Sequence, residues 1–172
     1  VYAFEPSIFN LELLGRNISI NQLVDKVVMI PIPLTEKLLE SKLGLSTTKY
    51  GGSQSTFHQK YTYDGSELIK KFDYTTIGIS VDQAVNLLQI PQPDYIKLDV
   101  DGIEHLILKG ARNVLNKTKS LLVEVDEKFT TQKQNVSECL ISAGFKLSHK
   151  KHSKLFDNTK YDSVFNQIWK KN

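Results

Sequence analysis

The distribution of apolar and polar positions along the chain predicts strands that alternate with helices. Short apolar runs predict strands at residues 1–4, 27–32, 76–80, 95–100, 120–125, 145–149 and 163–169. Apolar positions at helical spacing predict a helix that follows Ser7 and further helices at residues 81–88, 103–115 and 132–143. The stretch 36–73 lacks clean periodicity, and residues 50–55 within it have the composition of a flexible polar loop.

The order of these elements indicates an α/β fold. The strongest strands are apolar on both faces, which is typical of a parallel sheet buried between helices. The last two strands follow one another without an obvious helix, so we expect them to be antiparallel. We therefore expect a doubly wound, mostly parallel α/β sheet with an antiparallel edge strand, in a single domain over residues 1–172.

The charge balance and hydrophobicity of the chain argue against nucleic acid and membranes as partners. The 22 basic and 19 acidic residues give a net charge of +3, which is too balanced to indicate nucleic-acid binding. The single cysteine, Cys139, cannot form an internal disulfide. No apolar run approaches the roughly 20 residues of a membrane span. We expect a cytoplasmic protein that binds neither nucleic acid nor membrane.

Candidate chemistry lies at the predicted carboxyl ends of the strands, where α/β sheets bind their ligands. The acids found there are Glu5, Asp99, Asp101, Glu104 one helical turn later, Asp126 and Glu127. A carboxylate in this place can accept hydrogen bonds from both hydroxyls of a ribose. The alternative is that these acids are simply solvated, because strand ends meet water.

Six segments follow a known pattern in order and spacing. Residues 1–6 read VYAFEP, and residues 94–104 read DYIKLDVDGIE and are followed by LKGA at 108–111. The weaker matches are GRNISIN at 15–21, GGSQS at 51–55, ISVD at 79–82 and LLVEV at 121–125. Together they resemble the FkbM-type family of class I, Rossmann-like methyltransferases that depend on S-adenosylmethionine.

The resemblance implies methyl transfer to a hydroxyl oxygen of a sugar, polyketide or other small metabolite. It implies that Glu5 binds the ribose of S-adenosylmethionine and that Asp99 lies near the methyl group. Ser53 and Asp82 fall in matched segments and are further candidates for cofactor binding, although a plain surface loop explains Ser53 equally well. Asp101 stands where the family more often has Glu, one methylene longer, which leaves its role open.

The resemblance also implies a missing part. The family's first strand and its glycine-rich loop should precede Val1, and no G-x-G-x-x-G occurs in the chain. We therefore expect an N-terminally truncated domain in which the strands at 1–4 and 95–100 flank a vacant position.

An alcohol acceptor profits from a general base. The catalytic candidates are Asp99, Asp101 and Glu104; His58 and His105 are weaker ones, for which we expect surface roles. Asp99, Asp101 and Asp126 could instead bind Mg²⁺, but the matched motifs are not those of metal-dependent methyltransferases, and we expect no metal.

Other classes of function compete with a small-molecule O-methyltransferase. A non-catalytic remnant or interaction module would keep the fold without the cofactor. A nicotinamide-dependent oxidoreductase is disfavoured because its fingerprint is absent. The partner that we expect is a small-molecule or saccharide acceptor, and a homodimer is compatible with the sequence.

Two charges stand in otherwise apolar strands, Lys97 and Glu124. Burying an unpaired charge is costly. We expect the two side chains to pair, directly or through one water, beneath Asp99. The alternative is that one of them reaches solvent.

Overall fold

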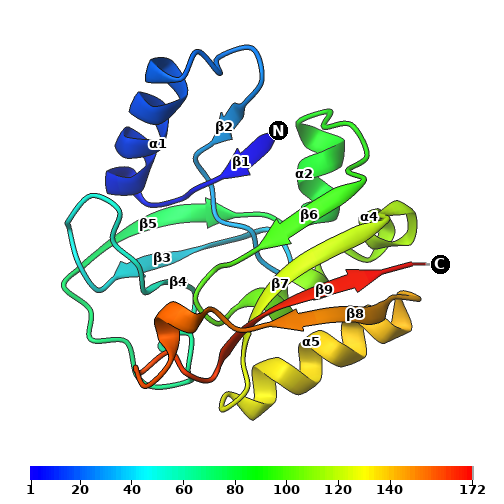
Figure 1. Ribbon diagram of the computed structural model, residues 1–172. Helices are drawn as coiled ribbons and strands as arrows, with labels where there is room; N and C mark the ends of the chain where they lie inside the picture. Colours follow the sequence, from blue (N-terminus) through cyan, green and yellow to red (C-terminus); the bar gives the residue numbers. More distant parts are fainter. Residues whose placement is uncertain (172) are drawn as a thin grey trace.

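The computed structural model describes residues 1–171, and strands and helices alternate along most of it (Figure 1). The strands are β1 (Tyr2–Phe4), β2 (Val28–Ile30), β3 (Leu39–Leu45), β4 (Ser55–Phe57), β5 (Phe72–Gly78), β6 (Tyr95–Leu98), β7 (Ser120–Asp126), β8 (Lys146–Lys151) and β9 (Val164–Lys170). The helices are α1 (Ile8–Ile20), α2 (Val81–Leu87), α3 (Glu104–Lys109), α4 (Arg112–Lys117), α5 (Thr130–Ser142) and the 3₁₀ turn η1 (Lys154–Phe156). Each strand that the apolar pattern predicts is present.

The described strands fall into three sheets, so the α/β class is confirmed but the expected single doubly wound parallel sheet is not. β1 and β2 form a parallel pair. A second sheet has the order β6-β7-β9-β8, in which β6 and β7 are parallel and β9 is antiparallel to both of its neighbours. The antiparallel pair at the C-terminal end is confirmed. The fold is a mixed α/β arrangement in which, among residues 1–171, two strand pairs are parallel and the others are antiparallel.

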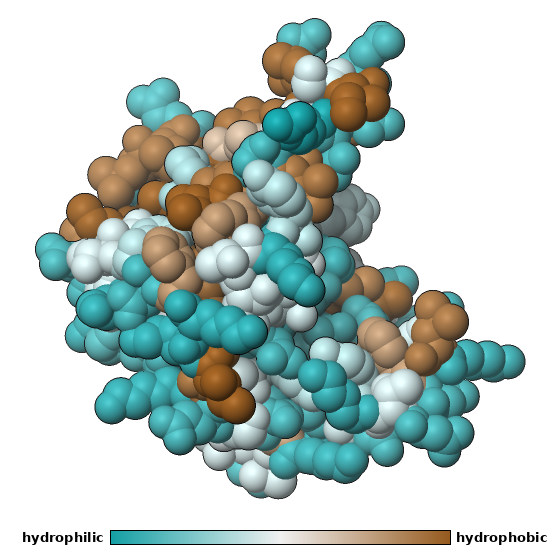
Figure 2. Space-filling view, turned by 90° about the vertical axis from the view of Figure 1, so that its left-hand side faces the viewer, coloured by the Kyte–Doolittle hydropathy of each residue, from teal (hydrophilic) through white to brown (hydrophobic). Residues whose placement is uncertain are grey.

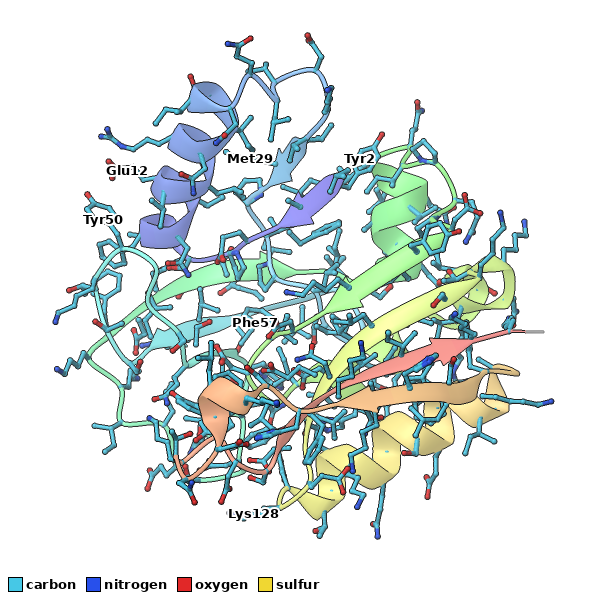
Figure 3. All side chains as sticks on the ribbon, in the orientation of Figure 1. Tyr2, Glu12, Met29, Tyr50, Phe57 and Lys128 are labelled. Atoms are coloured by element: carbon cyan, nitrogen blue, oxygen red, sulfur yellow. The ribbon has the colours of Figure 1, made fainter. Side chains whose placement is uncertain are left out.

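The third sheet is formed mostly by residues 39–75, a stretch in which the apolar pattern predicts no strand. Its order is β4-β3-β5, and both pairings are antiparallel. Polar Ser41 and the side-chain-free Gly44 interrupt the apolar alternation of β3, which hides the strand from a local pattern search. Its Leu43 and Leu45 are nevertheless buried, and Phe57 of β4 lies at the centre of the molecule (Figure 3).

β1 and β6, the two strands expected to flank a vacant strand position, do not pair with each other. Among the described residues, β1 pairs only with β2, and β6 pairs only with β7. Both strands therefore have one edge whose backbone groups no described strand satisfies. This agrees with the expected separation of β1 and β6, although the two belong to different sheets rather than to one.

The main core lies between the β6-β7-β9-β8 sheet and the helices that pack on it. Alternate residues of β7, namely Leu121, Val123 and Val125, are buried and belong to the same apolar cluster as Val136 and Leu140 of α5. These β7 residues share one face because side chains alternate along a strand. The opposite face of β7 carries the partly exposed Leu122 and Glu124.

The helix predicted at residues 103–115 is divided into α3 and α4 at Gly110. A β-carbon on Gly110 would lie 2.6 Å from the carbonyl oxygen of Thr35 and 2.8 Å from that of Glu36. The Gly110 carbonyl accepts a hydrogen bond from the Asp82 amide at 3.0 Å. The close approach of the 35–36 backbone thus requires glycine here.

The face that carries α1 has an uneven surface. Figure 2 shows apolar residues gathered on the upper part of this face and hydrophilic residues over much of the lower part. Ile8 and Leu13 of α1 are exposed to 47% and 37%. None of the helices formed by residues 1–171 has the length and apolar character that crossing a bilayer requires.

The contact at Gly110 gives the first prediction. Gly110→Ala should lower the free energy of unfolding by about 1–3 kcal/mol, because the added methyl meets backbone atoms that cannot move aside cheaply. Gly15→Ala in α1 is the matched control, since the nearest atoms to its β-carbon, on Met29, lie 3.7 Å away. That change should stabilise the protein by up to about 1 kcal/mol. Urea denaturation of both variants checks this, and an equal effect of the two would contradict it.

Candidate active site

A cavity of about 270 Å³ opens where the ends of β1 and β6 meet the loop before β4. Its polar lining is provided by Glu5, Asn10, Ser53, Ser55, Asp99 and Asp101. Four of the six residues expected in the site, Glu5, Ser53, Asp99 and Asp101, are therefore brought together from three distant segments. The other two, Asp82 and Glu104, do not line the cavity.

Glu5 is held in place by the start of α1. Its Oε1 accepts a hydrogen bond from the Ser7 amide at 2.8 Å, and its Oε2 accepts a longer one, 3.4 Å, from Asn10 Nδ2. Ser7 occupies the N-cap position, but its own side chain makes no capping bond. Burial raises the pKa of Glu5, and the nearby charge of Asp101 adds to this.

The loop that carries Ser53 is anchored on α1. Asn10 Nδ2 donates to the Gly52 carbonyl at 3.0 Å, and the Tyr50 hydroxyl donates to Glu12 Oε2 at 2.9 Å (Figure 3). The hydroxyl of Ser46 donates to the Ser53 carbonyl at 2.9 Å. These bonds hold the loop against α1, with Ser53 in the cavity lining.

Asp101 joins this loop to the end of β6. Its Oδ2 accepts hydrogen bonds from the amides of Gln54 at 2.8 Å and Ser55 at 3.2 Å. Burial raises the pKa of Asp101 above its ordinary range, although these two hydrogen bonds oppose the rise. Asp101 has a left-handed backbone (φ 55°), followed by Gly102 at φ 109°. The sharp turn directs the carboxylate away from the strand axis, towards the loop.

Lys97 pairs with Asp99 rather than with Glu124, so the predicted direct Lys97–Glu124 pair is wrong. The Lys97 ammonium lies 2.8 Å from Asp99 Oδ2, and its side chain is 67% exposed. The parallel register aligns Leu98 with Val123, which places Asp99 and not Lys97 beside Glu124. The expectation had assumed a register shifted by two residues.

Glu124, which was expected to pair with Lys97 beneath Asp99, is instead a direct neighbour of Asp99 itself. It lies on the partly exposed face of β7. Burial, together with the adjacent Asp99 carboxylate, raises the pKa of Glu124 to about 7. The signal available in the sequence was a carboxylate in the middle of an apolar strand.

Glu104 is a buried positioning residue. Its Oε1 accepts from the Val100 amide at 3.0 Å, and its Oε2 accepts from the Gly102 amide at 3.1 Å. Gln132 of α5 also donates to Oε2. Burial raises the pKa of Glu104 to about 7. Glu104 binds the backbone of the turn and lies outside the cavity lining, so its expected catalytic role stays a prediction.

Asp82 lies outside the cavity and binds the start of α4, so its expected role in cofactor binding stays a prediction. Its two carboxylate oxygens accept hydrogen bonds from the amides of Asn113 at 3.0 Å and Val114 at 2.9 Å, at the start of α4. These amides belong to the first turn of the helix, where backbone donors lack intrahelical partners. Through Asp82, the matched segment at residues 79–82 thus connects the start of α2 to the start of α4.

The remaining candidates lie outside the cavity lining. His58 is exposed as expected and shares a 2.9 Å hydrogen bond with Ser41 Oγ. His105 is buried, with 5% of its surface exposed, so the surface role expected for it is wrong. Asp126 accepts a hydrogen bond from the Lys128 amide in its own turn. Among residues 1–171, no three metal-ligating side chains lie close enough together to hold an ion.

Comparison with known proteins settles the family. The sequence model of the Methyltransferase FkbM domain matches residues 1–158. This chain belongs to the FkbM methyltransferase family. The family motif at residues 94–104 is the segment that forms β6 and the Asp99–Glu104 turn.

Two relatives place this FkbM domain more closely. The chain is 30% identical over 125 residues to the hexuronic acid methyltransferase AglP of Haloferax volcanii, and the match covers 73% of this chain and 46% of that protein. A crystal structure of methyltransferase FkbM from Methylobacillus flagellatus superimposes with a TM-score of 0.59 at 16% identity, over 99% of this chain and 36% of that one. The fold is therefore shared with the solved protein. This chain spans less than half the length of AglP and less than half the length of the solved protein.

The buried Glu104 gives the second prediction. Its folded-state pKa of about 7 lies above its ordinary value, so the folded protein binds the proton more tightly than the unfolded chain. Stability from this group is present at low pH and is lost as the pH rises towards and through 7. Relative to Glu104→Gln, the wild type should lose on the order of 2 kcal/mol of unfolding free energy between pH 4.5 and 8. Urea titrations across this range measure it, and parallel curves for the two proteins would refute it.

Proposed function

We propose that this chain is the catalytic domain of an S-adenosylmethionine-dependent methyltransferase that methylates a hydroxyl oxygen of a saccharide acceptor. The observation that supports it best is the single cavity that unites Glu5, Asp99 and Asp101 in a member of the FkbM family. The name of the relative AglP, a hexuronic acid methyltransferase, favours a saccharide among the small molecules that the family suggests.

The residues around Glu5 fit the ribose of the cofactor. Oε2 of Glu5 makes only a long bond to Asn10, so it can still accept from a hydroxyl. Asn10 Oδ1 is buried without a partner among the described residues and lines the same cavity. A ribose diol would supply the missing donors. S-adenosylmethionine, when bound, provides an electrophilic methyl group.

Asp101 is the best placed general base. Its Oδ2 is fixed by two backbone amides, and no described residue donates to Oδ1. Its pKa is raised by burial, which makes the carboxylate a stronger proton acceptor. Asp99 is paired with Lys97, whereas Asp101 has no salt bridge within the described residues. Asp101 would take the hydroxyl proton while the cavity walls orient the acceptor oxygen towards the methyl group.

The cofactor assignment gives the third prediction. In the full gene product, Glu5→Gln should weaken binding of S-adenosylhomocysteine roughly 10- to 100-fold, because charge-assisted hydrogen bonds to the ribose are lost. Glu138→Gln is the matched control, since Glu138 stands exposed on α5 and outside the cavity lining. Isothermal titration calorimetry measures both. Failure of the wild type to bind S-adenosylhomocysteine would overturn the proposal in favour of a non-catalytic interaction module.

The base assignment gives the fourth prediction. Asp101→Asn should lower kcat about 100-fold or more, with little change in cofactor affinity. The amide oxygen can still accept from Gln54 and Ser55, so the loop should stay in place. The rising limb of the pH–rate profile should lie above the ordinary range of an aspartate and vanish in the variant. Asp94→Asn, at an exposed salt bridge with Lys119, is the control and should leave kcat unchanged.

A further inference from the structure

A second and larger cavity, of about 440 Å³, lies next to the candidate active site. This volume falls in the range of typical small-molecule sites. Its walls come from the 46–54 loop, the 62–71 segment and Lys160. Of the residues that line it, only Gln54 lies in a segment that was matched to the family pattern.

The two cavities share a wall that carries Asp101. Gln54 lines the larger cavity and donates its backbone amide to Asp101, while its neighbours Ser53 and Ser55 line the smaller one. On the other side of the turn, a β-carbon on Gly102 would lie 2.6 Å from the Thr62 carbonyl oxygen. A molecule in the larger cavity is therefore separated from the base by little more than one layer of backbone.

The polar groups of the larger cavity are those that recognise a hydroxylated ring. Ser46, Thr62 and Ser66 contribute hydroxyls, Gln54 an amide and Glu67 a carboxylate. Tyr63 is 9% exposed, and its hydroxyl donates to the Lys160 carbonyl at 3.5 Å. An aromatic ring among several donors and acceptors is suited to a ligand with one apolar face and many hydroxyls.

Two cations in this cavity have no carboxylate partner. Neither Lys71 nor Lys160 forms a salt bridge within residues 1–171, whereas the adjacent Lys70 pairs with Asp73. The Lys160 ammonium lies 4.8 Å over the ring of Tyr161.

Of the two acids in the lining, Asp64 is occupied by its own turn. Its Oδ1 accepts from Thr62 Oγ1 at 2.8 Å and from the Ser66 amide at 2.9 Å. Glu67 is the remaining acid and can accept from ligand hydroxyls. The two lysines are thus left for an anionic group of the ligand.

We propose that this cavity binds the acceptor as an acidic saccharide, a hexuronic acid unit whose carboxylate pairs with Lys71 and Lys160. The inference rests on the proposed function, and it adds where the acceptor lies and which charge it carries. The acidic sugar unit lies along Tyr63, and a neighbouring unit of the same saccharide crosses the Gln54 rim between the two cavities and brings its reacting hydroxyl to Asp101 in the smaller one. The lysines determine specificity and take no part in the proton transfer.

The test is a pair of titrations of the full gene product with D-glucuronic acid and D-glucose, each with and without S-adenosylhomocysteine. Wild-type protein should bind glucuronic acid at least 10-fold more tightly than glucose. The double variant Lys71→Gln/Lys160→Gln should lose that preference and keep its affinity for glucose. Lys70→Gln is the matched control, because its side chain pairs with Asp73 and does not line the cavity, and it should behave as the wild type.

Two results would overturn the inference: equal affinity of the wild type for the two sugars, or an undiminished preference in the double variant. Neither depends on cofactor binding, because the sugars are also titrated alone. Loss of S-adenosylhomocysteine binding in the wild type would instead refute the proposed function. The two failures can therefore be told apart.

Discussion

The candidate site depends on one buried carboxylate. Glu104 is 2% exposed, yet it accepts hydrogen bonds from the backbone on both sides of Asp101 and from Gln132 of α5. These donors compensate for part of the penalty of burying a carboxylate, and the rest is seen in its raised pKa. The bonds fix a turn with two consecutive left-handed residues, Asp101 and Gly102. Without such support a non-glycine residue would not hold this backbone conformation cheaply.

The fixed turn positions the other parts of the site through a series of hydrogen bonds. Asp101 binds the amides of the Gln54–Ser55 segment, that loop binds Asn10, and Asn10 binds Glu5. A continuous chain of hydrogen bonds thus runs from the end of β6 to the end of β1, although no strand pairing joins them in the described residues. Hydrogen bonds of side chains and of the loop therefore connect β1 to β6 around the cavity, in place of the backbone hydrogen bonds that join paired strands.

The antiparallel β4-β3-β5 sheet is what sets this arrangement apart from a simple doubly wound sheet. It stands between β2 and α2 in the chain and carries, at the start of β4, the loop that separates the two cavities. Loops held by a rigid scaffold are where binding residues concentrate. The sheet therefore holds Gln54 and Tyr63, which line the larger cavity, beside the turn that is fixed by Glu104.

The sequence by itself determined the order of most elements, the strand-end acids and the family, because apolar periodicity and motif spacing are local properties of the chain. It located Glu5 and Asp101 for the same reason, since both directly follow predicted strands. It could not reveal β3, whose partner β5 lies about thirty residues downstream, nor the register that puts Asp99 beside Glu124. Only the tertiary structure separated Asp82 and Glu104, whose carboxylates bind backbone amides outside the cavity lining, from Asp101, which binds two backbone amides through one oxygen and also lines the cavity. The carboxylates are chemically alike, and what distinguishes them is where the fold places them and which groups it brings within hydrogen-bonding distance.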